Sequence, residues 1–249
     1  MSTIRDSLQY QPSSYSIMEH VAEADAILKV CSKEWPKVLP YLLEPSNLLA
    51  LGGLRGVSPY VTFGKQNKTV QSAEFVAFLK RFGLRLIREE TNYGPKFSEP
   101  IYMLIHTGAL AAVPDQYKAV ADWWVPEPKA YDHLNYLEWY LYNMTACQAM
   151  LEKGKLPKHW LAEWWAPHNL CFGMLLGYPG SAICSFAAAD MVQKSLNVAP
   201  DTATIEFRYP VNSGVKVAYD AQKIDMSSRQ IAAHQKRWQD FFDLIYSAW

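Results

Sequence analysis

Neither sign of charge is in excess in this sequence, and cysteine is scarce. Lys and Arg together number 24, as do Asp and Glu, and no long basic run occurs. A surface that binds nucleic acid needs concentrated cations to neutralise phosphates, so this balance predicts that nucleic acid is not a partner. The four cysteines are widely spaced in 249 residues, which is not the pattern of a disulfide framework.

Residues 1–16 lack an apolar run that could serve as a secretory signal. We therefore expect reduced thiols and a cytoplasmic location. Residues 1–12 are mostly polar and are expected to be flexible. Hydrophobic residues make up 50% of the chain, which is enough to bury a sizeable core, so the remainder is expected to fold.

Charge is absent altogether from residues 164–189. Residues 170–189 would be long enough to cross a bilayer as one helix, but the sequence Gly-Tyr-Pro-Gly interrupts them at 177–180. Gly177 is suited to end a helix and Pro179 to begin the next, which leaves two helices that are each too short to span. We therefore expect a buried helical hairpin at 169–196 and no membrane partner. The small residues Gly173 and Gly177 would allow another backbone to approach closely.

Four other segments carry helical signals. Ser16 and Glu19 form a capping-box pattern, and apolar residues then recur at helical spacing to Cys31. Residues 69–82 predict a second helix that ends at Gly83, and residues 132–151 predict a third. Residues 227–230 form another capping box before a C-terminal apolar stripe that is expected to dock on the protein body. The apolar faces expected for the second and last helices are Phe75, Val76, Leu79 and Phe82, and Ile231, Trp238, Phe241 and Ile245.

Strand signals are fewer. Residues 204–209 and 215–219 alternate apolar and polar side chains around a loop with Pro and Gly, which predicts an antiparallel hairpin near 204–219. Residues 60–63, 84–88 and 101–106 are further candidates, although the last could instead begin a helix running to 113. The expected fold is α+β: a helix-rich single domain over 1–249 with a small, partly antiparallel sheet. A boundary within it could fall near 125–132.

Aromatic residues are abundant, with nine Trp and fifteen Tyr. The pattern Ala-acidic-Trp-Trp-X-Pro occurs at 121–126 and again at 162–167. One interpretation is a shared way of ending a helix before proline, with Trp packed inward. The functional alternative is a pair of aromatic walls around a ligand, which would be formed by Trp123, Trp124, Trp164 and Trp165.

Complete catalytic motifs are missing: Gly-x-Ser-x-Gly, His-Glu-x-x-His and the phosphate-binding loop do not occur. The remaining candidates for a thiol site are Cys184, with His168 or His106 as its base. Spacings typical of zinc ligands are also missing, so neither a metal nor a cofactor is expected. The basic residues of 234–237 are expected on the solvated side of the last helix.

Two functions stay open on these grounds. The first is a soluble binding protein that holds a protein or small molecule on aromatic-rich surfaces or in a groove. The alternative is a thiol- or carboxylate-dependent hydrolase or transferase with a Cys/His site. The sequence leaves the ligand and the oligomeric state open.

Overall fold

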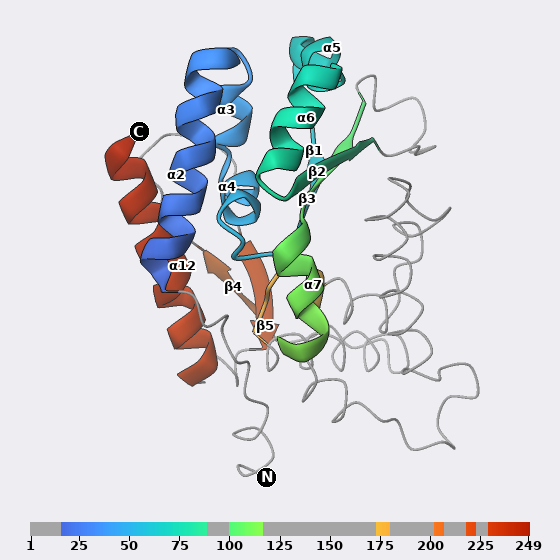
Figure 1. The fold of residues 1–249 in the computed structure, drawn as a ribbon. Helices are drawn as coiled ribbons and strands as arrows, with labels where there is room; N and C mark the ends of the chain where they lie inside the picture. Colours follow the sequence, from blue (N-terminus) through green and yellow to red (C-terminus); the bar gives the residue numbers. More distant parts are fainter. Residues whose placement is uncertain (1–15, 89–99, 117–172, 180–201, 207–217, 223–228) are drawn as a thin grey trace, which may run out of the picture.

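A computed structural model of the chain describes residues 16–88, 100–116, 173–179, 202–206, 218–222 and 229–249 (Figure 1). These residues form a helix-rich α+β fold, as expected. Its helices are α2 (Ile17–Glu34), α3 (Leu39–Leu42), α4 (Pro45–Leu51), α5 (Asn67–Val70), α6 (Ala73–Arg81), α7 (Thr107–Gln116) and α12 (Arg229–Ala248), with a 3-10 turn η1 (Gly64–Gln66). Its strands are β1 (Val57–Val61), β2 (Leu84–Arg88), β3 (Tyr102–His106), β4 (Thr202–Glu206) and β5 (Ala218–Gln222).

Strand β3 is the centre of a three-stranded sheet of order β1-β3-β2. It is antiparallel to both neighbours, so β1 and β2 run in the same direction and are joined by the crossover through α5 and α6. All five residues of β3 are buried. Pro59 lies in the edge strand β1, where the register shifts between Ser58 and Val61, and such an edge tolerates a residue without an N–H group.

The hairpin expected near 204–219 is confirmed as an antiparallel pair of strands, with bounds moved slightly outward. Strand β4 pairs with β5 from Thr202 opposite Gln222 to Glu206 opposite Ala218. Residues 102–106 form a strand, β3, and not the start of a helix. Helix α7 begins at the next residue, Thr107.

The helices build layers against the three-stranded sheet. Helix α4 packs on β1 and β3, α2 packs on α4, and α12 lies beside α2 at the outside (Figure 1). Helix α6 covers β2. One apolar core joins these layers, and its aromatic residues include Phe63, Phe75, Trp238, Phe241 and Phe242. The C-terminal helix therefore docks on the body of the protein, as its apolar stripe predicted.

The capping box that begins α2 is confirmed. The hydroxyl of Ser16 accepts from the backbone N–H of Glu19 at 3.3 Å, and the Glu19 carboxylate accepts from the backbone N–H of Ser16 at 2.5 Å. Of the predicted stripe, Ala24, Leu28 and Cys31 are fully buried, whereas Ile17 and Val21 are only half-buried. This helix positions the side chains of the candidate site described below.

Helix α6 differs from the expectation for residues 69–82. Two helices form instead of one, because Ser72 adopts an extended conformation and its hydroxyl caps α6 by accepting from the N–H of Phe75 at 3.2 Å. Val76 is 47% exposed, so its assignment to the buried face was wrong. Phe78 takes that place, since Phe75, Phe78 and Leu79 follow the i, i+3, i+4 spacing of one face.

The assignment of residues 234–237 to a solvated face was wrong in part. His234 is 3% exposed and lies on the buried stripe, because it is four residues before Trp238 and seven before Phe241. Its ring contacts that of Trp238 at 4.3 Å between centroids. Lys236 does face solvent, where it pairs with Asp240.

Residues 173–179 are the described part of the charge-free segment, and they are largely buried. A helical turn ends here in the Schellman arrangement: Gly177 has φ of +75°, its N–H donates to Met174 O, and the Tyr178 N–H donates to Gly173 O. The role of Gly177 as a helix stop is thus confirmed. The rest of the expected hairpin at 169–196 lies outside the described residues.

Three consecutive carbonyl groups at the end of this turn, those of residues 175–177, accept hydrogen bonds from distant parts of the chain. The donors are the N–H of Gly56 at 3.0 Å, Nε of Arg55 at 3.2 Å and Nε2 of His234 at 3.0 Å. The guanidinium of Arg55 also lies 5.3 Å from the ring centroid of Trp238. These bonds satisfy carbonyl groups that a helix end leaves open, and they join the segment to the loop before β1 and to α12.

Several expectations fall on residues that the structure does not describe. They concern the flexible segment 1–12, the boundary near 125–132, the helix at 132–151 and the first two residues, 227 and 228, of the expected capping box. Within the described ranges, no helix combines the length and the apolar character needed to cross a membrane.

Candidate functional site

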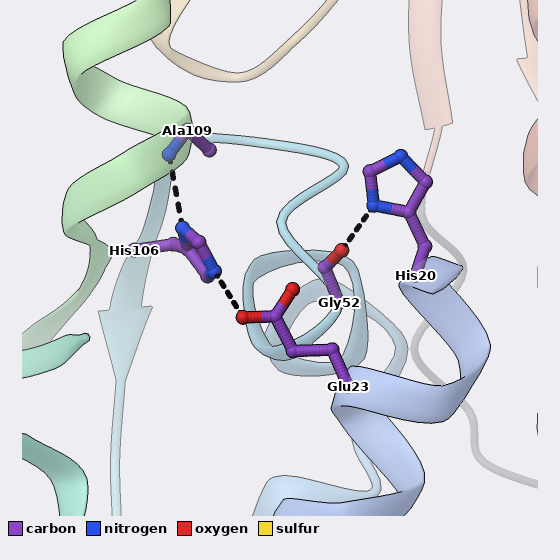
Figure 2. Close-up of polar contacts among 5 residues, drawn as sticks. All are labelled: His20, Glu23, Gly52, His106 and Ala109. Atoms are coloured by element: carbon purple, nitrogen blue, oxygen red, sulfur yellow. Dashed lines mark hydrogen bonds and ion pairs between the residues drawn. The ribbon is translucent and has the colours of Figure 1, made fainter. Parts of the chain in front are cut away.

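A cluster of polar side chains surrounds the turn that follows α4. His20 and Glu23 reach it from α2, and His106 reaches it from the end of β3 (Figure 2). The turn itself is another Schellman end, in which Gly53 has φ of +67°. A Cβ atom on Gly53 would lie 3.2 Å from Nε2 of His106, so glycine leaves room for the imidazole as well as adopting the required backbone conformation.

His106 joins α7 to α2. Its Nδ1 accepts from the backbone N–H of Ala109 at 2.9 Å, so this imidazole acts as the N-terminal cap of α7 (Figure 2). Because Nδ1 accepts, the ring proton lies on Nε2, which donates to Oε1 of Glu23 at 3.0 Å. Both ring nitrogens are thus engaged, and His106 has no lone pair available to take a proton from a substrate in this arrangement.

His20 joins α2 to α4 and α12. A carbonyl oxygen can only accept, so Nδ1–H of His20 donates to Gly52 O, 2.5 Å away (Figure 2). A guanidinium can only donate, so Nε2 of His20 accepts from Arg237, 2.8 Å away. His20 is therefore the neutral tautomer with its proton on Nδ1. Burial lowers the pKa of His20 below its ordinary value, and the Arg237 charge acts in the same direction.

An apolar groove lies on the other side of α2, between α2 and α12. It encloses about 490 Å³, and its lining residues are Met18, Val21, Ala22, Asp25, Lys29, Ile245, Ala248 and Trp249. Met18 is 58% exposed and Trp249 is 38% exposed. Both are large apolar side chains that the protein leaves in contact with water.

The rim of this groove is polar and internally paired. Asp25 accepts from Lys29 at 2.5 Å and from Nε1 of Trp249 at 3.1 Å. The second contact fixes the indole ring across the gap between the two helices. The groove can therefore bury an apolar surface while its edge offers one carboxylate and one ammonium group.

Of the site residues expected from the sequence, the structure describes His106 alone. Its partner is Glu23, not a thiol, among the described residues. The other expected residues lie outside the described ranges, so their roles stay predictions: Cys184, His168, Trp123, Trp124, Trp164 and Trp165. No group of three His, Cys, Asp or Glu side chains in the described part of the chain could hold a metal ion.

Comparison with known proteins gives no match to a family model, to a curated protein or to a solved structure.

Sequence reasoning missed His20, Glu23 and the groove. A signal for His20 was present, because it lies three residues after Ile17 and four before Ala24 on the apolar stripe of α2. A histidine at such a position has to find polar partners inside the protein. The groove could not be found in this way, because it requires knowing which face of α12 docks on α2.

We expect Cys31 to resist thiol reagents in the folded protein. Burial raises the pKa of its thiol to about 12, and Sγ donates to Trp35 O at 3.6 Å. The thiolate fraction at pH 8 would then be on the order of 10⁻⁴, and the sulfur has no exposed surface. Iodoacetamide labelling with peptide mapping should show Cys31 unmodified until denaturant is added. Labelling in the folded state as fast as in a peptide would contradict its buried position.

Proposed function

We propose that this protein is a binding protein that holds an amphipathic helix of a partner protein in the groove between α2 and α12. The observation that carries the proposal is a groove in which Met18, Val21 and Ala22 of α2 lie beside an apolar wall from α12, with Asp25 and Lys29 continuing the α2 side. A groove between two packed helices accepts a third helix through ridges and gaps of matching spacing.

The α2 side of the groove has the length of a short helix. The α2 residues that line the groove are 18, 21, 22, 25 and 29, which follow the spacing i, i+3, i+4, i+7 and i+11. Eleven residues of helix rise about 16 Å, or three turns. A partner helix of three turns is needed to cover these residues from end to end, with apolar side chains against Met18, Val21 and Ala22 and polar ones against Asp25 and Lys29.

The lining chemistry suits such a partner. Met18 is flexible enough to adjust to different apolar side chains, and Trp249 offers a flat ring with a polar edge. Ala22 and Ala248 leave space between them for a bulky side chain. The charged residues of the lining are Asp25 and Lys29, so the partner helix would carry Lys or Arg beside Asp25 and an acidic residue beside Lys29.

Selection from a displayed library of helical peptides of about 15 residues tests this proposal. We expect the selected peptides to share apolar residues at helical spacing and to bind with dissociation constants on the order of 10 µM. Replacing Ala22 by Trp should fill the groove and weaken binding at least tenfold. Ala22 is exposed, so the substitution leaves the core intact.

Ala26→Trp is the matched control, since Ala26 is also exposed on α2 but does not line the groove. It should bind the selected peptides as the unsubstituted protein does. The proposal is wrong if Ala22→Trp binds as well as Ala26→Trp, or if the selected peptides lack helical spacing. If a small apolar dye binds in the groove and no peptide does, the proposed helical partner is wrong and the occupant is a small molecule.

The alternative of a Cys/His hydrolase or transferase stays a prediction, since it depends on Cys184 and His168. We also keep the cytoplasm as the expected compartment, and Cys31, which is a free thiol, fits a reducing environment.

A further inference from the structure

We propose that His20 makes the contact between α2 and α12 sensitive to acid, so that the groove releases its occupant when this imidazole gains a proton. The release of an occupant rests on the proposed function, whereas the response of α12 to acid does not.

The tautomer of His20 determines where an added proton binds. Nδ1–H is committed to Gly52 O at 2.5 Å, so an added proton can bind only to Nε2. Nε2 faces a guanidinium nitrogen of Arg237 at 2.8 Å. After protonation two donors and two positive charges would meet at this distance, and a hydrogen bond would become a repulsion. The contact between the helices therefore exists in one protonation state and is lost in the other.

Several charged groups around His20 raise or lower its pKa, and in the described part of the chain they come from different helices and strands. Arg237 faces it from α12, Glu23 from the next turn of α2, and His106 from β3, while α4 offers the uncharged carbonyl of Gly52. Burial is the largest influence on the pKa of His20 and lowers it. The Gly52 carbonyl and Glu23 act to raise this pKa, whereas the charges of Arg237 and His106 act to lower it. The net result is a pKa of His20 below its ordinary value. The neutral form therefore persists at neutral pH and the transition falls below the ordinary value of 6.5.

The contact can act on the groove through α12. His20 itself faces away from the groove, on the opposite side of α2 from Met18. Arg237 is eight residues before Ile245 on α12, where the opposite wall begins. A movement of α12 away from His20 would therefore separate the two walls. By linkage, an occupant that needs both walls would also make His20 harder to protonate.

Three measurements between pH 7.5 and 5.0 test the proposal on the full chain. The first follows the Cε1–H signal of His20 by NMR, and the ring ¹⁵N shifts report its tautomer. The second is amide hydrogen exchange of α12 without any peptide. The third is binding of a peptide selected as above. We expect one midpoint below pH 6.5 for the His20 signal and for a fall in the protection factors of α12, where each exchange rate is compared with the intrinsic rate at the same pH. Peptide affinity should fall at least tenfold once His20 is fully protonated.

His20→Asn removes the titration of His20 and keeps an N–H donor for the Gly52 carbonyl. It is made together with His234→Gln, so that protonation of His234 does not contribute, and it is compared with His234→Gln alone. The α12 protection factors and the peptide affinity of the double variant should then change less than twofold over this range. Arg237→Gln provides a second variant that keeps a neutral donor opposite Nε2; its His20 should titrate at higher pH than in the unsubstituted protein. Unchanged α12 protection factors while His20 titrates would overturn the proposal. So would an acid response of equal size in the double variant and in His234→Gln alone. If no peptide binds at any pH but α12 still responds through His20, the proposed function fails and the acid-sensitive contact stands.

Discussion

Replacing His234 by Gln is expected to remove a large part of the acid sensitivity of folding. His234 lies on the inner face of α12, where its Nε2–H donates to Gly177 O at 3.0 Å. Burial lowers the pKa of His234 to about 3, and the charges of Arg55 and Arg237 also act to lower it. The folded protein therefore keeps this imidazole neutral, whereas the unfolded chain binds a proton below about pH 6.5.

The sign of the effect follows from this difference. The stabilising contribution of neutral His234 is complete above pH 6.5 and is lost as the pH falls from there towards 3. At about 1.36 kcal/mol for each pH unit, the loss between pH 7.5 and 4.5 is about 3 kcal/mol. Gln can donate to the same carbonyl and does not titrate, so His234→Gln should lack this loss.

Urea unfolding at pH 7.5 and at pH 4.5 measures the fall in the free energy of unfolding between the two pH values. Each variant is compared with itself, so a change of stability that is the same at both pH values cancels. Lys236→Gln, at an exposed position of the same helix, should behave as the unsubstituted protein does. An equal fall in the free energy of unfolding for His234→Gln and for Lys236→Gln would show that His234 is not held neutral by the fold.

The second large effect is expected from Gly177→Ala. Gly177 has φ of +75°, where an L-residue costs about 1–2 kcal/mol. A Cβ atom would also lie 2.7 Å from the carbonyl oxygen of Leu54, which is backbone and cannot move aside as a flexible side chain would. Together these effects should lower the free energy of unfolding by about 3 kcal/mol or more. Urea unfolding at neutral pH measures it.

Gly83→Ala separates the two causes. Gly83 has φ of +66°, and among the described residues its Cβ atom would meet the hydroxyl of Thr107 alone, at 3.3 Å. Its cost should therefore stay at about 1–2 kcal/mol. If Gly177→Ala cost no more than Gly83→Ala, the close approach of residues 173–179 to the loop before β1 would be contradicted.

The sequence was most informative where one residue type decides local geometry. Ser16 with Glu19, Gly83 and Gly177 each act on their own neighbours, and the structure shows each of them at the end of a helix. Hydrophobic spacing likewise placed Cys31 and Trp238 inside. These features depend on a few consecutive residues, so they can be predicted without knowledge of the tertiary fold.

The errors share a different cause. His234 was assigned to solvent because its neighbours in sequence are charged, although a helix places it on the same face as Trp238. The site around His20 combines residues from α2, the turn after α4, β3 and α12. Its partners are separated by up to 217 positions in the chain, and no local pattern encodes such a meeting.

Binding of a helical partner between α2 and α12 is tested most directly by ¹³C-methyl NMR of the methionines during titration with a selected peptide. Met18 lines the groove and is 58% exposed, whereas Met103 and Met174 are buried away from it at 0% and 1%. We expect the Met18 methyl signal to shift and broaden in proportion to bound peptide, while those of Met103 and Met174 stay in place. A peptide that binds and leaves the Met18 signal unchanged would contradict the account.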